Sequence, residues 1–230
     1  MKKITLLPFL FMAVFFVSCH DDSGDFAEKY YPDSEKSTAL KQCLNLARDT
    51  ANAHLSVPGG YTYYNNAAYR INLPTATTPV IDTLAKYGQQ STVDSLIIRL
   101  NRAAERTGDQ VRTVFGEAIT QTTFYDPDYF INGSSRVATE YFRSNKTVYL
   151  IDNLKPWVQI KMNETQASAT WNQILATYAQ YTTQPVNIDL NQEITRQMVN
   201  HLLTEMGLEE QKIRTDPTHR KTTLLKEIFK

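Results

Sequence analysis

The strongest constraint on the fold is a series of apolar stripes at helical spacing along most of the chain. The longest stripe recurs every four residues and comprises Leu190, Ile194, Met198, Leu202 and Met206. Residues three or four apart share one face of an α-helix, so each stripe predicts an amphipathic helix. No βαβ rhythm is present, and glycines and prolines are few. The sequence therefore predicts an all-α fold, a single multi-helix, bundle-like domain over residues 37–230.

Local signals give the expected helix boundaries. Thr78 as N-cap, Pro79 at the first helical position and Gly88 after the end predict one helix, and Ser91 as N-cap predicts the next. The helices on either side of Thr107-Gly108 are expected to lie antiparallel because the turn is short. Pro156 is expected to end or kink its helix, since its ring displaces a backbone carbonyl.

One segment near residues 59–74, GGYTYYNNAAYRINLP, breaks the helical pattern. Its glycines, asparagines and final proline predict an irregular loop or a short hairpin. The side chains of Tyr64, Asn66 and Arg70 are candidates to line a polar, aromatic binding cleft. The alternative is that the tyrosines pack as a lid over the helical core.

The N-terminus carries an export pattern. Two lysines precede an apolar run that ends at Ser18 and Cys19, which predicts a signal peptide over residues 1–18 and lipid attachment at Cys19. Residues 19–36 are predicted to be the lipidated cysteine and an acidic, flexible tether. We therefore expect an outer-membrane lipoprotein, periplasmic or surface-exposed, held on the membrane through Cys19. The alternative is an ordinary secretory signal with an incidental cysteine.

Charge and cysteine content limit the possible partners. Cleavage after residue 18 removes two of 24 basic side chains and none of 24 acidic ones, which leaves a net charge near −2. Nucleic acid is not an expected partner, because it requires a basic surface. After lipidation of Cys19 the remaining thiol is Cys43, so no internal disulfide is expected.

No metal or cofactor is expected from the sequence. The four histidines, His20, His54, His201 and His219, show none of the spacings typical of metal sites. His201 and Glu205 lie one helical turn apart and are interpreted as a surface contact. Glycine-rich phosphate loops and strained nucleophile motifs are also absent.

Two polar clusters are candidate sites. In NRAAERTGDQVR, Asn101, Arg102 and Glu105 share one ridge beside small alanines, which allow another backbone to approach closely. The ridge is interpreted as a structural Arg-Glu pair or as an anion-binding or acid-base site. In KIRTDPTHR, Arg214 and Arg220 flank a turn and form either a charged corner or a receptor for a carboxylate or phosphate.

These segments together resemble a bacterial family known as domain of unknown function 4197. The likeness rests on the order of GGYTYYNNAAYRINLP, NRAAE, ATEYF and KIRTDPTHRKTTLLKEIF, and it covers roughly residues 36–230. It implies an exported, mostly helical envelope protein, often a lipoprotein, with no catalytic assignment to transfer. The matching segments contain the candidates Arg70, Asn101, Arg102, Glu105, Arg214 and Arg220.

The leading hypothesis is a lipid-anchored binding or structural module of the cell envelope, with an unknown small-molecule or protein partner. In this hypothesis the Tyr/Asn loop and the ridge form one groove. The alternative is an envelope enzyme acting on a small anionic or polymeric substrate, with Glu105 as acid or base and Arg102 holding an anion. A protein-interaction subunit, which would expose a large apolar patch, is a third possibility.

Overall fold

The computed structural model describes residues 30–63 and 67–230, and residues 31–230 form one compact unit. The described residues contain ten α-helices, two 3-10 helices and no strand, which confirms the all-α prediction. The predicted signal peptide and Cys19 lie outside them. The elements are α1 (Asp33–Leu55), α2 (Gly60–Tyr63), η2 (Thr75–Thr77), α3 (Thr78–Lys86), α4 (Gln90–Glu105), α5 (Gly108–Thr120), α6 (Pro127–Asn132), α7 (Val137–Glu164), α8 (Ala167–Tyr178), α9 (Leu190–Thr215), η3 (Pro217–His219) and α10 (Thr223–Ile228).

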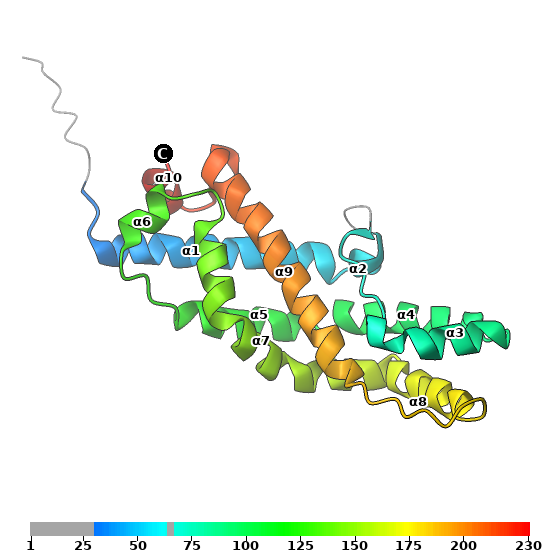
Figure 1. Cartoon of the computed structure of the whole chain (residues 1–230). Helices are drawn as coiled ribbons and strands as arrows, with labels where there is room; N and C mark the ends of the chain where they lie inside the picture. The colour runs from blue at the N-terminus through cyan, green and yellow to red at the C-terminus, as the bar shows by residue number, and fades with distance from the viewer. Residues whose placement is uncertain (1–29, 64–66) are drawn as a thin grey trace, which may run out of the picture. The chain divides into compact units, whose positions relative to one another are not determined.

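Three long helices organise the compact unit. Helix α9 crosses and packs against both α1 and α7, and α5 contacts the same two helices (Figure 1). Helix α7 continues beyond this crossing to meet α4 and α8, and α3 packs on the same pair. The two short helices α6 and α10 rest against α1.

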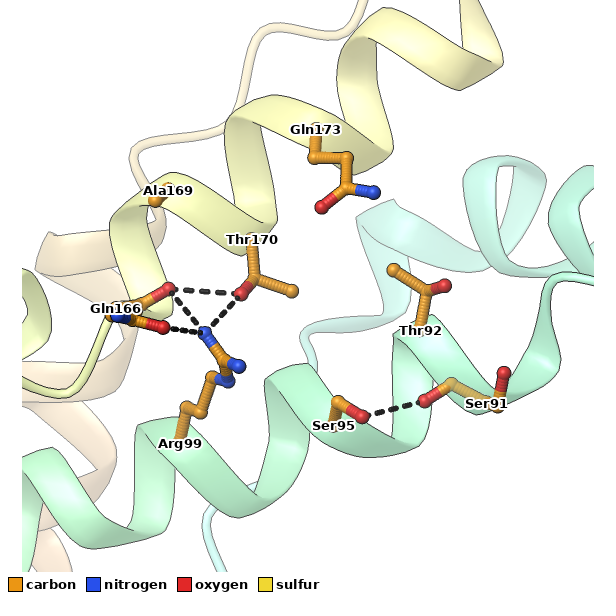
Figure 2. A pocket seen from close by; sticks show the side chains of 8 residues that line it. All are labelled: Ser91, Thr92, Ser95, Arg99, Gln166, Ala169, Thr170 and Gln173. Atoms are coloured by element: carbon orange, nitrogen blue, oxygen red, sulfur yellow. Dashed lines mark hydrogen bonds between the residues drawn. The ribbon is translucent and has the colours of Figure 1, made fainter.

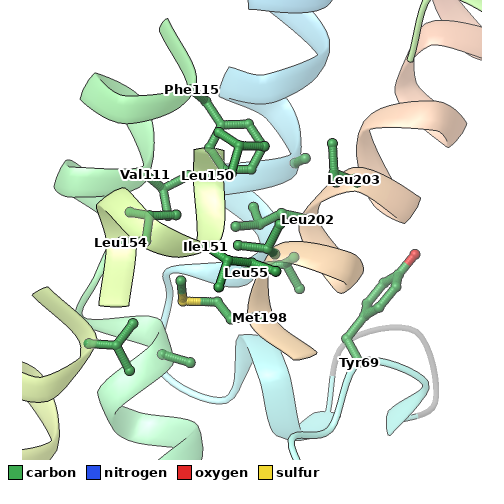
Figure 3. Close-up of a cluster of buried hydrophobic side chains, with 14 of the residues drawn as sticks. Leu55, Tyr69, Val111, Phe115, Leu150, Ile151, Leu154, Met198, Leu202 and Leu203 are labelled. Carbon is green, nitrogen blue, oxygen red and sulfur yellow. The ribbon is translucent and has the colours of Figure 1, made fainter. Parts of the chain in front are cut away.

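The core lies where these helices cross. Figure 3 shows side chains of α1, α5, α7 and α9 meeting in one apolar cluster. Among them, Leu55, Phe115, Leu150 and Leu202 have no exposed surface. The apolar stripes predicted from the sequence therefore supply the contacts between helices, and each fully buried leucine or phenylalanine contributes roughly 1.5–3 kcal/mol relative to its exposed state.

Cys43 of α1 belongs to this core. Its thiol is free and has no exposed surface. Burial raises its pKa strongly, and the negative charge of Glu210 adds to that effect, while the positive charge of Arg214 opposes it. A thiol kept protonated and covered is chemically inert in the folded state.

Helix α1 begins earlier than expected. It starts at Asp33, so residues 33–36, the last four of the predicted tether, are helical. Pro32 occupies the N-cap position, and its carbonyl accepts hydrogen bonds from the amides of Glu35 and Lys36. The carboxylates of Asp33 and Glu35 lie in the first turn, where the helix dipole favours negative charge. Two acidic residues of the predicted tether, Asp33 and Glu35, therefore begin the helix.

Pro156 does not end its helix, because α7 runs from Val137 through Pro156 to Glu164. Proline has no amide hydrogen, so the carbonyl of Asp152, four residues back, loses its hydrogen-bond donor. Both residues are on the exposed side of α7. Water can bind this carbonyl there, so the helix tolerates the proline.

Helices α4 and α5 do not form the expected antiparallel pair. Figure 1 shows them following one another in nearly one line, and they pack on different neighbours, α4 on α8 and α5 on α1. The two linking residues explain this, because Arg106 (φ −75°, ψ −5°) and Thr107 (φ −87°, ψ 1°) stay close to helical conformation. The chain therefore continues forward without reversing.

The caps of α3 and α4 are partly as predicted. Gly88 (φ 72°) ends α3, and the amide of Gln89 donates to the carbonyl of Leu84, as in a Schellman motif. The N-cap positions are Thr77 and Gln89 instead of Thr78 and Ser91, and neither makes a side-chain capping bond. The start of each helix therefore lies one or two residues before the predicted one.

A buried carboxylate on α9 holds the start of α7. Glu210 has no exposed surface, and its oxygens accept hydrogen bonds from the backbone amides of Ala138 (3.1 Å) and Thr139 (2.7 Å). These amides belong to the first turn of α7, where no intrahelical partner exists. Arg214, one turn further along α9, pairs with the same carboxylate at 2.8 Å.

We predict that Arg214→Ala lowers the free energy of unfolding by about 3–5 kcal/mol, because it leaves the Glu210 charge buried without its cation. Urea denaturation followed by circular dichroism measures the change. Arg143→Ala is the control, since Arg143 pairs with the exposed Glu140 and should cost no more than about 1 kcal/mol. Equal losses in the two variants would contradict the role given to Glu210.

Candidate functional site

The Tyr/Asn segment and the polar ridge contact each other, as the sequence analysis supposed. The Asn101 side chain donates to the Ile71 carbonyl at 2.8 Å and accepts from the Ile71 amide at 3.0 Å. Glu105 accepts from the Gly59 amide and from Arg102, both at 2.8 Å. Asn101 and Glu105 are almost completely buried, so these contacts fasten residues 59–71 to α4.

The segment itself folds around two glycines and a short helix, with no hairpin among its described residues. Gly59 adopts a positive φ of 87°, and a side chain on Gly60 would collide with the Leu55 carbonyl. Glycine is therefore required where the chain leaves α1 and turns toward α4. Tyr64 and Asn66 lie outside the described residues, and the Arg70 side chain is exposed.

The C-terminal arginines hold backbone carbonyls. Arg214 donates to the carbonyls of Phe130 and Ile131 at the end of α6 as well as to Glu210. Arg220 donates to the carbonyls of Ile213 and Arg214 in the last turn of α9. Both guanidinium groups are buried, and these contacts account for their positions. A role in ligand binding stays a prediction for both, as it does for Arg70, Asn101, Arg102 and Glu105.

A different polar cluster joins α1 and α9. His54 Nδ1 lies 2.9 Å from Glu205 Oε1, across 151 residues of sequence, and the Tyr69 hydroxyl donates to Glu205 Oε2 at 2.7 Å. Glu209, one turn further along α9, pairs with Lys212 at 2.6 Å. One ligand atom from each of His54, Glu205 and Glu209 lies within 4.8 Å of the others.

The burial of this cluster is unusual for charged groups. Glu205 is 2% exposed and Glu209 is 3% exposed. Carboxylates are rarely buried unless they are paired, and here two are buried on neighbouring turns of one helix. Their cationic neighbours are more accessible, since the side chains of His54 and Lys212 are 33% and 47% exposed. The pattern places negative charge inside and positive charge at the surface.

A pocket of about 220 Å³ opens beside the cluster, between α1 and α9. We call it the α1/α9 pocket. The chain from η3 to Lys221 closes one side of it. Its lining residues are Leu46, Thr50, His54, Glu209, Lys212, Ile213, His219 and Lys221. Four of them can carry positive charge and one carries negative charge, so the pocket offers donors and an acceptor to a small polar ligand.

His201 lies one turn before Glu205 on α9. The rings of Tyr61 and Tyr69 lie 6.4 Å and 5.6 Å from its ring, and its Nδ1 is buried without a hydrogen-bond partner among the described residues. Burial lowers the pKa of His201, and the nearby charge of Arg196 lowers it further. Burial therefore disfavours the charged form of this imidazole.

A second pocket, of about 390 Å³, lies between α4 and α8 (Figure 2). Its one charged lining residue is Arg99, whose Nη1 lies within hydrogen-bonding distance of the Gln166 carbonyl, the Gln166 side chain and Thr170. Gln166 has a positive φ of 62° at the start of α8. Arg99 therefore stabilises the strained start of α8. Among the described residues, Arg99 is the one ionisable side chain that lines this pocket.

The sequence analysis missed the α1/α9 cluster. His201-Glu205 was interpreted as a surface contact, which is wrong, because Glu205 is buried and binds His54 and Tyr69. The available signal was the spacing of His201, Glu205 and Glu209 at successive turns beside the apolar stripe of α9. His54 likewise lies beside the buried apolar residues of α1, such as Ala51 and Leu55. Nothing in the sequence shows that α1 and α9 cross at His54.

Comparison with known families gives the identity of the domain. The family model described as protein of unknown function (DUF4197) matches residues 30–230. The chain belongs to this family. The match begins at the start of the compact unit and covers all the residues of both pockets. No curated protein and no solved structure matches the chain.

No helix among the residues that the structure describes is long and apolar enough to cross a membrane. The family match, over residues 30–230, and the compact unit, over residues 31–230, cover nearly the same part of the chain. The description of the family names no activity, so any function for this DUF4197 chain has to be argued from its own residues.

We predict that His201 makes the protein less stable as the pH falls from 7 to 5. The unfolded state takes up a proton near the ordinary histidine pKa of about 6.5, whereas the folded state resists it, so stability is lost below that pH. Urea unfolding at both pH values should show a smaller loss for His201→Gln than for the parent. His219→Gln, at the exposed η3 turn, should keep the parental loss. An unchanged loss in His201→Gln would contradict the prediction.

Proposed function

We propose that this protein is a lipid-anchored binding module of the bacterial cell envelope, attached through Cys19, and that the α1/α9 pocket is its ligand site. The observation that carries the binding role is the pocket itself, which sets two lysines and two histidines around the buried carboxylate of Glu209. Burying a carboxylate has a desolvation cost, and buried ionisable groups beside a pocket are more often found at functional sites.

The anchor is supported by the sequence before the folded unit. The positive residues Lys2 and Lys3, the apolar run and Ser18-Cys19 have the order of a lipoprotein signal. The compact unit and the family match both begin near residue 30. In the sequence, residues 20–29, which hold four of the chain's acidic residues, therefore separate Cys19 from the folded domain. We propose an outer-membrane location for the protein.

Cys19→Ala should leave an unprocessed or soluble protein, because no other residue would carry the acyl chains. Detergent phase partitioning of cell lysates, with detection of the protein and its size by antibody, measures this. Cys43→Ala is the matched control and should be processed and stay with the membrane, since the Cys43 thiol is buried in the core. A processed Cys19→Ala protein that still enters the detergent phase would contradict the anchor.

The ligand class follows from the size and charge of the pocket. A volume of about 220 Å³ lies below the roughly 300–1,000 Å³ of typical ligand pockets, so the ligand is small. Lys212, Lys221 and the two histidines offer donors to an anionic group, while Glu209 offers an acceptor to a cationic one. A small polar molecule or ion fits this combination better than an apolar one.

Native mass spectrometry of the full protein in detergent micelles tests the binding role. The parent should carry a small adduct that Thr50→Arg loses, because the arginine side chain would fill the pocket from α1. Thr92→Arg is the matched control, since Thr92 is a similarly half-buried threonine lining the α4/α8 pocket. This variant should keep the adduct.

Two outcomes would contradict the proposal. A parent protein that carries no adduct under gentle desalting would remove the binding role. An adduct retained by Thr50→Arg but lost by Thr92→Arg would place the ligand site between α4 and α8 instead.

A further inference from the structure

We propose that His54, Glu205 and Glu209 bind a first-row transition-metal dication such as Zn²⁺ at the inner wall of the α1/α9 pocket. The inference deepens the proposed binding function and rests on it. Its basis is the convergence of one imidazole and two carboxylates, from two helices, on a space within 4.8 Å.

The electrostatics of the cluster favour a cation. Glu205 and Glu209 are buried on successive turns of α9, so their like charges repel in a medium that screens poorly. Among the described residues, Glu209 pairs with Lys212, whose side chain is half exposed, and Glu205 contacts the partly exposed His54. A dication would neutralise both carboxylates from a single point.

The donor set points to the class of metal. Calcium and magnesium favour sites made entirely of oxygen atoms, whereas imidazole nitrogen suits zinc, copper, iron and nickel. One histidine nitrogen with two carboxylate oxygens gives three protein ligands, which leaves a coordination position for water or for a ligand in the pocket. The pocket supplies that opening, because His54 and Glu209 both line it.

The distances already approach those of a coordination sphere. With metal–ligand bonds of roughly 2.0–2.2 Å, neighbouring ligand atoms of a tetrahedral site lie about 3.3–3.6 Å apart. His54 Nδ1 and Glu205 Oε1 are 2.9 Å apart. A metal between them takes the place of the hydrogen of their hydrogen bond, and the imidazole then carries its hydrogen on Nε2. Glu209 closes the site by rotating its side chain away from Lys212.

A supporting contact orients one of the ligands. The Tyr69 hydroxyl donates to Glu205 Oε2 and leaves Oε1 directed at His54. Hydrogen bonds of this kind fix ligating carboxylates, and their loss typically weakens metal binding 10–100-fold. In the proposed site Tyr69 is therefore a positioning residue.

The test uses the full protein in detergent micelles, stripped of metal by EDTA and titrated with Zn²⁺ in a calorimeter. The parent should bind one equivalent. Glu209→Gln and His54→Gln should each bind at least about 10-fold more weakly, and Tyr69→Phe about 10-fold more weakly. Glu193→Gln, at a partly exposed glutamate of α9 that pairs with Arg196 and lies outside the cluster, is the matched control and should bind like the parent.

Cobalt substitution provides a second readout. Co²⁺ in a site with a nitrogen and two oxygen ligands should give visible absorption in the parent and in Glu193→Gln, and lose it in His54→Gln. His54 is partly exposed, so this variant remains informative if Glu209→Gln fails to fold.

Absence of stoichiometric Zn²⁺ binding by the parent, or equal binding by the parent and both ligand variants, would overturn the metal site. Failure of the metal site is distinguishable from failure of the proposed function. An adduct that survives EDTA treatment and is lost only in Thr50→Arg would leave the pocket as a ligand site without a metal.

Discussion

The contact between Glu210 and the first turn of α7 is the interaction on which the arrangement of the long helices depends. The carboxylate replaces a side-chain N-cap, because Arg136, at the N-cap position, makes none. Arg214 balances its charge and extends the network to the end of α6, and it also stacks on the Phe229 ring at 4.7 Å. One buried ion pair therefore determines where α6, α7, α9 and the C-terminal residues meet.

Much of the fold follows from the sequence for a simple reason. Apolar residues at helical spacing can be buried only if the segment is helical, so the stripes of α1, α5, α8 and α9 identified their helices directly. The errors concern boundaries and directions. Periodicity gives neither the first residue of α1 nor the solvent exposure that lets α7 continue through Pro156. It also does not give the conformation of the two residues that link α4 and α5.

The site was less predictable than the fold. The ridge from Asn101 to Glu105 was identified as polar and close to another backbone, and the structure places residues 59–71 there. The α1/α9 cluster escaped notice because its members are far apart in the chain and each looks ordinary alone. Glu205 and Glu209 are candidate site residues because they are buried, and their burial depends on how α1 packs against α9.

The covered thiol of Cys43 has a practical consequence for measuring the stability of the domain. Cys43 has no exposed surface and a raised pKa, so alkylating reagents reach it only when the helices separate. The rate at which it becomes labelled therefore reports the opening of the core directly. Alkylation of Cys43 can therefore follow unfolding of the domain without an engineered cysteine.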